Sequence, residues 1–211
     1  MHAARTIGPV RLVDLRGDQP AVLGLGADPE TGVADWLAVG PTAPTDALDR
    51  LGVEVAPSLS LLPKGRLGSV LEPAIAAETG AALAVALRDG PLTIVDVGVP
   101  DTAVARAVLE VCDVSLLVIR ECYLALRRAS QCPGVARSFG IVVLQEPGRS
   151  LGPADVGQVL GRPVVARIPT RAAIARAVDA GVLANRLPEP LSRAAAQIFR
   201  ELGIVRRGLA A

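Results

Sequence analysis

Residues 92–101, LTIVDVGVPD, contain the pattern that decides the fold of this chain. An aliphatic run leads into Asp96, and Gly98 follows two positions later. Near-continuous aliphatic runs are typical of strands that are covered on both faces. A carboxylate at the end of such a strand could hold a magnesium ion beside a phosphate, or it could simply cap the next turn. The stretch therefore raises the question of where a phosphate-binding partner segment would lie.

The same pattern recurs along the whole chain. Short aliphatic runs predict strands at residues 10–15, 59–63, 92–97, 114–119, 139–144 and 163–168. Between them, helical patterns cover residues 68–88, 102–111, 121–130, 153–160, 170–180 and 189–202. Strands that alternate with helices imply right-handed crossovers. The expected fold is α/β, a doubly wound, mostly parallel sheet with helices on both faces.

Residues at the ends of these elements support the assignment. Asp101 and Thr170 stand where helix N-caps belong, and Gly181 and Gly203 follow helix ends as stops. In such sheets ligands bind beyond the carboxyl ends of the strands. Asp14 ends the first strand as Asp96 ends the third, so the choice between magnesium ligand and turn cap applies to both.

Composition excludes several classes of function. Hydrophobic residues make up 51% of the 211 residues and aromatic ones only 2%, so the core must be aliphatic. With 22 basic and 21 acidic residues, the net charge of +1 attracts neither nucleic acid nor an anionic membrane. Three cysteines without a C-x-x-C pair give no zinc pattern and predict buried thiols in a reducing, cytoplasmic setting. No targeting segment is visible.

No phosphate-binding loop of the form G-x-x-x-x-G-K-[ST] occurs in the sequence. Lys64, the only lysine, follows a proline and is not followed by Ser or Thr. The glycines of residues 24–32, GLGADPETG, lack the spacing of a dinucleotide fingerprint, which predicts an ordinary turn and linker.

The order of the segments resembles the ParA/MinD-like branch (SIMIBI class) of the P-loop NTPase superfamily, from about residue 10 to residue 202. Residues 168–181, a strand ending in Ile-Pro and a helix with AVDAG, look like that branch's segment near the adenine base. LSLLPKG, residues 59–65, resembles its Leu-Pro-x-Gly turn, and VDVG, residues 95–98, its magnesium-side strand. The finer likeness is to TadZ and CpaE of pilus and secretion systems, and to actinobacterial MinD-like proteins.

The resemblance implies a set of site residues. Asp14, Asp96 and Gly98 correspond to the nucleotide and magnesium side, with Asp96 as the metal-side residue, and Gln145 and Pro169 lie near the base. Gln145 stands where the family usually has asparagine, so an amide is retained. The family's second switch carboxylate is replaced by Arg16, although Asp18 could substitute. We therefore expect remnant binding residues and no catalytic ones.

A strand, loop and helix for phosphate binding need about 30 residues, whereas nine residues precede Val10. We expect residues 1–9 to be an extension, residues 10–203 the ParA/MinD-like domain, and residues 204–211 a tail. Without its phosphate-loop strand, the sheet would have unpaired neighbours on either side. The gap would have to close by re-pairing, by residues 1–9 or by a partner chain, so we expect residual heterogeneity or dimerisation.

The first functional hypothesis is a degenerate, non-hydrolysing positioning or assembly scaffold, for a pilus, secretion or partitioning system, that acts as a homodimer or with a partner protein. It would need no cofactor. The alternative is an active ATPase of the same family, using ATP and magnesium, whose phosphate loop lies upstream of Met1. Enzyme activity is therefore left open.

A third hypothesis is a DNA or membrane-surface module. Arg127 and Arg128, or Arg206 and Arg207, could contact phosphates, and the last helix could lie peripherally on a membrane through Ile198, Phe199 and Leu202. The sparse basic residues and the short apolar stripe favour a packing helix instead.

Overall fold

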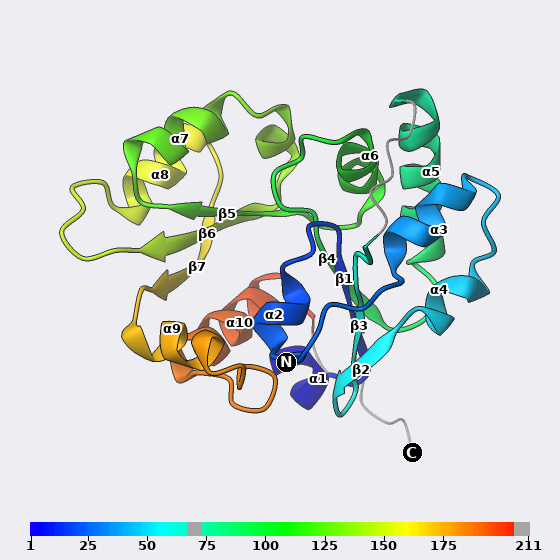
Figure 1. The fold of residues 1–211 in the computed structure, drawn as a ribbon. Coiled ribbons are helices and arrows are strands. Elements are labelled where there is room, and N and C mark those ends of the chain that lie inside the picture. Colours follow the sequence, from blue (N-terminus) through cyan, green and yellow to red (C-terminus); the bar gives the residue numbers. More distant parts are fainter. Residues whose placement is uncertain (67–72, 205–211) are drawn as a thin grey trace, which may run out of the picture. The chain divides into compact units, whose positions relative to one another are not determined.

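The computed structural model describes residues 1–66 and 73–204, so the expected helix start at 68–72 and most of the tail lie outside the described residues. The chain divides into two compact units (Figure 1). The first comprises Met1, Ala3–Cys112 and Ala177–Arg186, and the second comprises His2, Asp113–Arg176 and the chain from Leu187 on. Each unit is built around its own sheet.

The sheet of the first unit has the strand order β2-β3-β1-β4. Its strands are β1 (Val10–Asp14), β2 (Val53–Ala56), β3 (Leu59–Leu62) and β4 (Leu92–Asp96). β1 is central and pairs in parallel with β3 and β4, while β2 is antiparallel to β3. In the β1–β4 register Asp14 is opposite Asp96, so the two carboxylates leave the sheet at the same edge.

Helices and loops cover both faces of this sheet (Figure 1). Val13, Leu62 and Val95 point to one face, where they join a core with Trp36 and Leu83. That face is covered by α3 (Val33–Val39), α5 (Pro73–Ala86) and α6 (Ala103–Val111), with α4 (Asp46–Arg50) beside them. The opposite face packs against α2 (Gln19–Leu23) and residues 181–186.

The second unit has a parallel sheet with the strand order β5-β6-β7. Its strands are β5 (Leu116–Arg120), β6 (Gly140–Gln145) and β7 (Val164–Pro169). One face packs against α7 (Tyr123–Ser130), the 3-10 turn η1 (Pro133–Arg137) and α8 (Pro153–Leu160). The other face packs against α10 (Glu189–Glu201). α9 (Ala172–Asp179) follows β7.

The structure confirms the α/β class, with mostly parallel strands and helices on both faces. The strands of the described residues nevertheless belong to two sheets rather than one. Residues 1–9 do not add a strand to either sheet, because His2–Thr6 form the short helix α1. The strands on the two sides of the gap do not pair with each other in the described residues, and residues 1–9 do not fill it. Closure by a partner chain stays a prediction.

The two predicted glycine stops are confirmed, and the two predicted N-cap residues are wrong. Gly181 and Gly203 both have left-handed φ angles, of 63° and 65°, two residues after α9 and α10 end. The N-cap of α6 is Thr102, whose hydroxyl accepts the Ala105 amide, and not Asp101. α9 begins at Ala172, which places Thr170 one residue before the N-cap position. The Asp101 carboxylate instead forms an ion pair with Arg16.

Candidate functional site: an acidic turn at the sheet edge

Asp14 organises the turn after β1. Its Oδ1 accepts the backbone amides of Arg16 and Gly17 at 2.9 and 2.7 Å, and its Oδ2 accepts the Gln19 amide at 2.9 Å. The residue is fully buried, with 0% of its surface exposed. A buried charge is stable only where hydrogen bonds replace its hydration. Three amides of one turn do this here, so Asp14 holds the turn in place.

Asp96 is bound to the same turn from the neighbouring strand. Its Oδ2 accepts the side-chain amide of Gln19 at 2.7 Å, and its Oδ1 accepts the Gly98 backbone amide at 3.0 Å. Gln19 thus contacts both carboxylates, one through its backbone and one through its side chain. Sequence reasoning missed this residue, because a glutamine five positions after an aspartate matches no motif.

Arg16 lies across the loop after β4. Its guanidinium pairs with Asp101 at 3.1 Å, and its aliphatic stem covers Gly98. A Cβ added at Gly98 would come within 2.6 Å of Arg16 Cγ, and the φ of Gly98 is +57°. Glycine is therefore required here by its backbone conformation and by the close approach of Arg16. Arg16, which stands in place of the family's second switch carboxylate, thus contacts the loop after β4 at both Gly98 and Asp101.

The hydrogen bonds of Asp14 and Asp96 occupy part of the oxygen surface that a magnesium ion would use. Magnesium requires oxygen ligands with free lone pairs in octahedral geometry, usually from carboxylates and water. Asp14 is buried and bound to its own turn, and Asp96 faces an amide donor. Within residues 1–66 and 73–204, no group of three or more His, Cys, Asp or Glu side chains could hold a metal. The magnesium role expected of Asp96 stays a prediction.

The second crevice loop packs against the segment expected to be a linker. The Val33 amide donates to Pro63 O at 2.7 Å and the Ala34 amide to Lys64 O at 2.9 Å. Gly32 lies so close that an added Cβ would meet Pro63 O at 2.1 Å. The Lys64 side chain extends toward Gly17, where an added Cβ would be 3.4 Å from Lys64 Cδ. The end of the expected linker, residues 24–32, is therefore packed against the loop that follows β3.

In the second unit the structure brings together the two residues expected near a base. Gln145 and Pro169 are opposite each other in the β6–β7 register. Both line a cleft of about 390 Å³ at the carboxyl ends of the strands, together with Glu121, Arg149 and Arg171. The Glu121 carboxylate is buried and accepts the Gln145 side-chain amide at 3.4 Å. Glu121 was not expected from the sequence.

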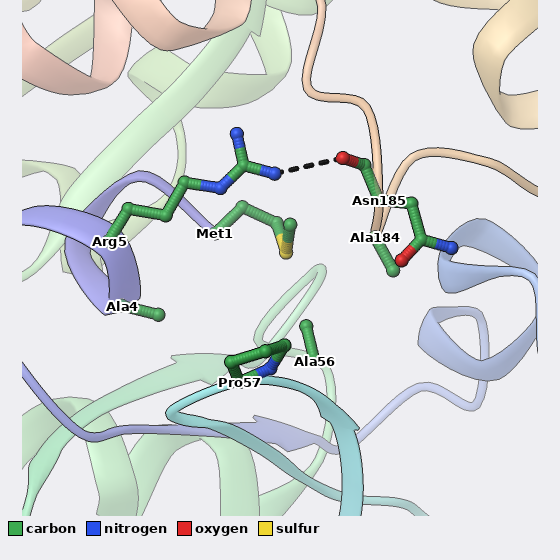
Figure 2. Close-up of a pocket in the computed structure, with 7 residues that line it drawn as sticks. All are labelled: Met1, Ala4, Arg5, Ala56, Pro57, Ala184 and Asn185. Atoms are coloured by element: carbon green, nitrogen blue, oxygen red, sulfur yellow. Dashed lines mark hydrogen bonds between the residues drawn. The ribbon is translucent and has the colours of Figure 1, made fainter.

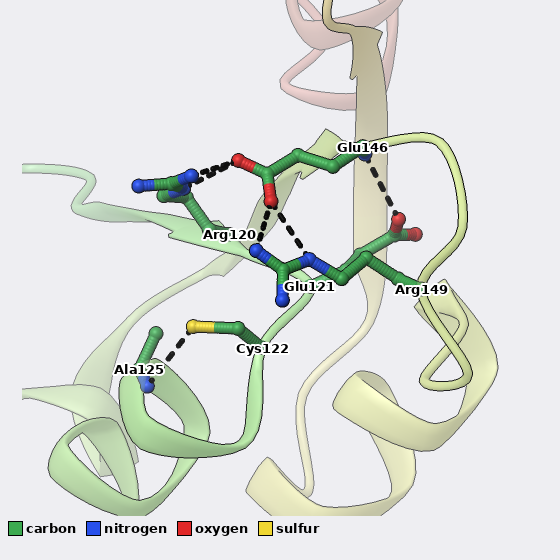
Figure 3. Close-up of polar contacts among 6 residues, drawn as sticks. All are labelled: Arg120, Glu121, Cys122, Ala125, Glu146 and Arg149. Carbon is green, nitrogen blue, oxygen red and sulfur yellow. Dashed lines mark hydrogen bonds and ion pairs between the residues drawn. The ribbon is translucent and has the colours of Figure 1, made fainter.

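An ion-pair clamp borders this cleft (Figure 3). Glu146 Oε1 accepts from Arg120 Nε at 2.6 Å and Oε2 from Arg149 Nε at 2.8 Å, so each carboxylate oxygen is bound by one guanidinium. Hydrogen bonds from Arg149 first, and then from Arg120, lower the pKa of Glu146 below its ordinary value. The same contact raises the pKa of Arg149. The clamp ties the end of β5 to the loop after β6.

A second hollow in the first unit offers little chemistry. It has a volume of about 270 Å³ and is lined by α1, the β2–β3 turn and residues 184–185 (Figure 2). Its main polar contact is Arg5 Nη2 donating to the Asn185 carbonyl at 2.9 Å. This contact fastens α1 to the rest of the unit, so the hollow is a seam between packed segments.

Comparisons with known proteins identify solved structures with a similar fold. No protein-family model matches the chain, and no curated protein sequence matches it. A ParA family ATPase from Chlorobium tepidum matches with a TM-score of 0.70 at 24% identity, over 92% of this chain and 84% of that one. The fold is that of the ParA and MinD ATPases.

Two further matches support this. A chain of the MinC:MinD cell division protein complex from Aquifex aeolicus gives a TM-score of 0.67 at 19% identity, over 96% of this chain and 86% of that one. McdA from Cyanothece, solved with ATP, gives 0.68 at 15%, over 96% and 87%. At these identities the similarity establishes the ParA/MinD fold and leaves the activity to be argued from the site.

The remaining candidate surfaces on the ParA/MinD fold are weak. Arg127 and Arg128 are exposed at the end of α7, while Arg206 and Arg207 lie outside the described residues. On α10, Ile198 packs on the sheet and Phe199 stacks on His2 with ring centroids 6.0 Å apart. These contacts make α10 a packing helix, as expected. In the part of the chain that the structure describes, no helix has the length and apolar character that crossing a membrane requires.

Proposed function

We propose that the chain is a degenerate, non-hydrolysing ParA/MinD-like protein that works as a positioning or assembly scaffold. The observation that carries the proposal is the closed acidic turn. Each oxygen of Asp14 and Asp96 accepts a hydrogen bond from the protein itself. A turn whose carboxylate oxygens all accept hydrogen bonds from the protein supports the fold, and its carboxylates are less available to a nucleotide-bound metal.

Arg16 adds to this argument. In a site that hydrolyses ATP, a carboxylate or amide must orient the attacking water. The side chain at this position is a cation that pairs with Asp101, and Asp18, the possible substitute, makes no capping bond with its own helix. The position of the second switch carboxylate is therefore occupied by a cation that is engaged with Asp101.

The finer assignment follows the sequence resemblance. The likeness to TadZ and CpaE suggests a pilus or secretion system, or a partitioning system, as the machinery that the scaffold would position. Such a protein acts through contacts with a second copy or a partner protein, without a cofactor. The near-neutral net charge of +1 agrees with protein partners rather than nucleic acid.

One observation favours the alternative, an active ATPase whose phosphate loop is encoded upstream of Met1. Asp14 and Asp96 leave adjacent parallel strands in register, which is where a phosphate site of this fold would need carboxylates. Translating the DNA upstream of Met1 distinguishes the two proposals. An in-frame strand followed by G-x-x-x-x-G-K-[ST] would replace the scaffold with the ATPase.

The scaffold proposal is tested by phosphate release from ATP with magnesium, using the full chain. The expected rate equals that of the Asp96→Ala variant and of buffer, because Arg16 stands in place of the carboxylate that would orient the attacking water. Turnover by the wild-type chain that Asp96→Ala abolishes, in a variant whose Trp36 fluorescence shows an intact first unit, would contradict the proposal.

A further inference from the structure

The near-neutral charge of the whole chain is divided unequally between its two units. Residues 113–176 and 187–204, the described part of the second unit apart from His2, contain 11 arginines and six acidic residues. The described residues of the first unit contain nine basic and 14 acidic residues. The formal charges are therefore +5 and −5. An asymmetry of this size between two parts of one chain indicates a charged partner for at least one of them.

In the second unit, one face of α7 combines arginines with exposed apolar side chains. The buried side of the helix joins the core above the sheet. On the outer side Tyr123 is 70% and Leu124 56% exposed, and Arg127 and Arg128 are exposed one turn later. Side chains four residues apart on a helix are neighbours, so each apolar side chain lies beside one arginine. These four residues are called the α7 face below.

The two arginines of the α7 face have no acidic partner in the described chain. Ion pairs of the second unit engage other arginines, those of Arg120, Arg149 and Arg193, and α7 itself contains no acidic residue. Arginines in the last turn of a helix are favoured by the helix dipole. That accounts for the charges but not for the apolar residues in the first turn, where Tyr123 is the most exposed large hydrophobic residue of the described chain.

The make-up of the α7 face favours a polypeptide partner. Tyrosine and arginine are the side chains that most often carry the binding energy of protein interfaces. Nucleic-acid binding depends on many phosphate contacts, whereas this face offers two guanidinium groups. An extended polyanion would also be repelled by the acidic first unit of the same chain, whereas a short acidic segment need contact only α7. A second copy, related by a two-fold axis, would place arginines against arginines.

We propose that the α7 face is the docking surface for an acidic segment of a partner protein, in which carboxylates follow an apolar side chain. The apolar side chain would cover Tyr123 and Leu124, and the carboxylates would pair with Arg127 and Arg128. This inference deepens the scaffold proposal by naming a surface and the chemistry of the partner. It rests on that proposal only in that a scaffold works through protein contacts, and it does not involve the acidic turn.

Tyr123 is the only tyrosine of the chain, so incorporation of 3-fluorotyrosine places a single fluorine NMR probe on the α7 face. The first measurement is made on the full chain without a partner. A soluble paramagnetic agent should broaden the fluorine signal, because Tyr123 is exposed. A signal that the agent leaves sharp would overturn the proposal, since another part of the chain would then cover α7.

The binding probe is a synthetic peptide of glutamate and leucine, and the same peptide with glutamine in place of glutamate is its control. The acidic peptide should shift the Tyr123 signal saturably, and added salt should weaken the effect. The double variant Arg127→Glu/Arg128→Glu should weaken binding at least ~10-fold, because two attractive contacts become repulsive. The glutamine peptide should leave the signal unchanged.

The matched control variant is Arg176→Glu/Arg200→Glu. It makes the same change of charge at two exposed arginines of the second unit, but on α9 and α10. This variant should bind the acidic peptide almost as the wild type does, and circular dichroism should show that both double variants are folded. Equal weakening by the two double variants would mean that the charge of the unit, and not the α7 face, attracts the peptide, which contradicts the proposal.

The remaining outcomes separate the acidic segment from other occupants. The proposal fails if neither peptide shifts the signal or if both shift it equally. It also fails if duplex DNA or phosphatidylglycerol vesicles bind more tightly than the peptide and lose binding in the α7 variant, or if the α7 variant abolishes self-association of the chain. None of these measurements depends on ATP turnover. Turnover with intact peptide binding would remove the scaffold proposal alone, and absent peptide binding without turnover would remove the docking surface alone.

Discussion

Replacing Asp14 with alanine should destabilise the first unit by about 3 kcal/mol. The carboxylate accepts three backbone amides, and each hydrogen bond to a charged group contributes about 1.5–3 kcal/mol. The Arg16 amide belongs to an exposed residue and can bind water after the substitution. The loss therefore corresponds to two bonds at about 1.5 kcal/mol each.

Trp36, the only tryptophan, is buried in the core of the first unit, so its fluorescence reports the unfolding of that unit. With a slope of about 2 kcal/mol per molar urea, the Asp14→Ala variant should unfold at a midpoint lower by about 1.5 M. Asp18→Ala is the control, because the neighbouring exposed carboxylate makes no capping bond. It should leave the midpoint unchanged.

Asp96→Ala completes the comparison. It releases the Gln19 side chain and the Gly98 amide, both of which can reach water, so the expected cost is about 1 kcal/mol or less. The reasoning fails if Asp14→Ala costs no more than Asp96→Ala. Two carboxylates held together for a metal would repel each other without it, and removing either one would then stabilise the fold.

Three further predictions concern single residues. Gly32→Ala should destabilise the first unit by at least about 2 kcal/mol, because its Cβ would meet Pro63 O at 2.1 Å, whereas Gly26→Ala, with open space around it, should be tolerated in the same urea titration. Thr79→Val should raise stability by about 1 kcal/mol, since Thr79 Oγ1 is buried and has no hydrogen-bond partner among the described residues; an unchanged or lower urea midpoint would contradict this. The two arginines lower the pKa of Glu146 below its ordinary value of 4.5, so the clamp stabilises the fold above that pH, and this stabilisation is lost as pH falls through the folded-state pKa. Glu146→Gln should therefore flatten the acid limb of a plot of unfolding temperature against pH, followed by circular dichroism. Parallel acid limbs for the variant and the wild type would argue against the clamp.

The strands could be predicted from the sequence because each is a continuous aliphatic run with no competing pattern. β2 was missed since VEVA is four residues long and carries Glu54, which suits only an edge. The short helices α1 to α4 were missed for a different reason. Helices of five to seven residues are stabilised by tertiary contacts rather than by their own propensity.

The candidate site was predictable in its placement and not in its contacts. Parallel neighbouring strands end at one edge, so the proximity of Asp14 and Asp96 follows from topology. That Gln19 would bridge them depends on the path of the turn, which no spacing rule supplies. Asp101 was expected to cap α6, but the adjacent Thr102 caps it and leaves Asp101 to pair with Arg16. Neighbouring residues with equal capping ability are not distinguishable by pattern.

The central claim is that the acidic turn is closed and serves the fold. The most direct test is a calorimetric titration of the full wild-type chain with ATP in the presence of magnesium. The account predicts no binding heat at micromolar nucleotide, because both carboxylates are occupied by the protein itself. Micromolar affinity that disappears in Asp96→Ala, with the Trp36 unfolding transition of that variant retained, would contradict it.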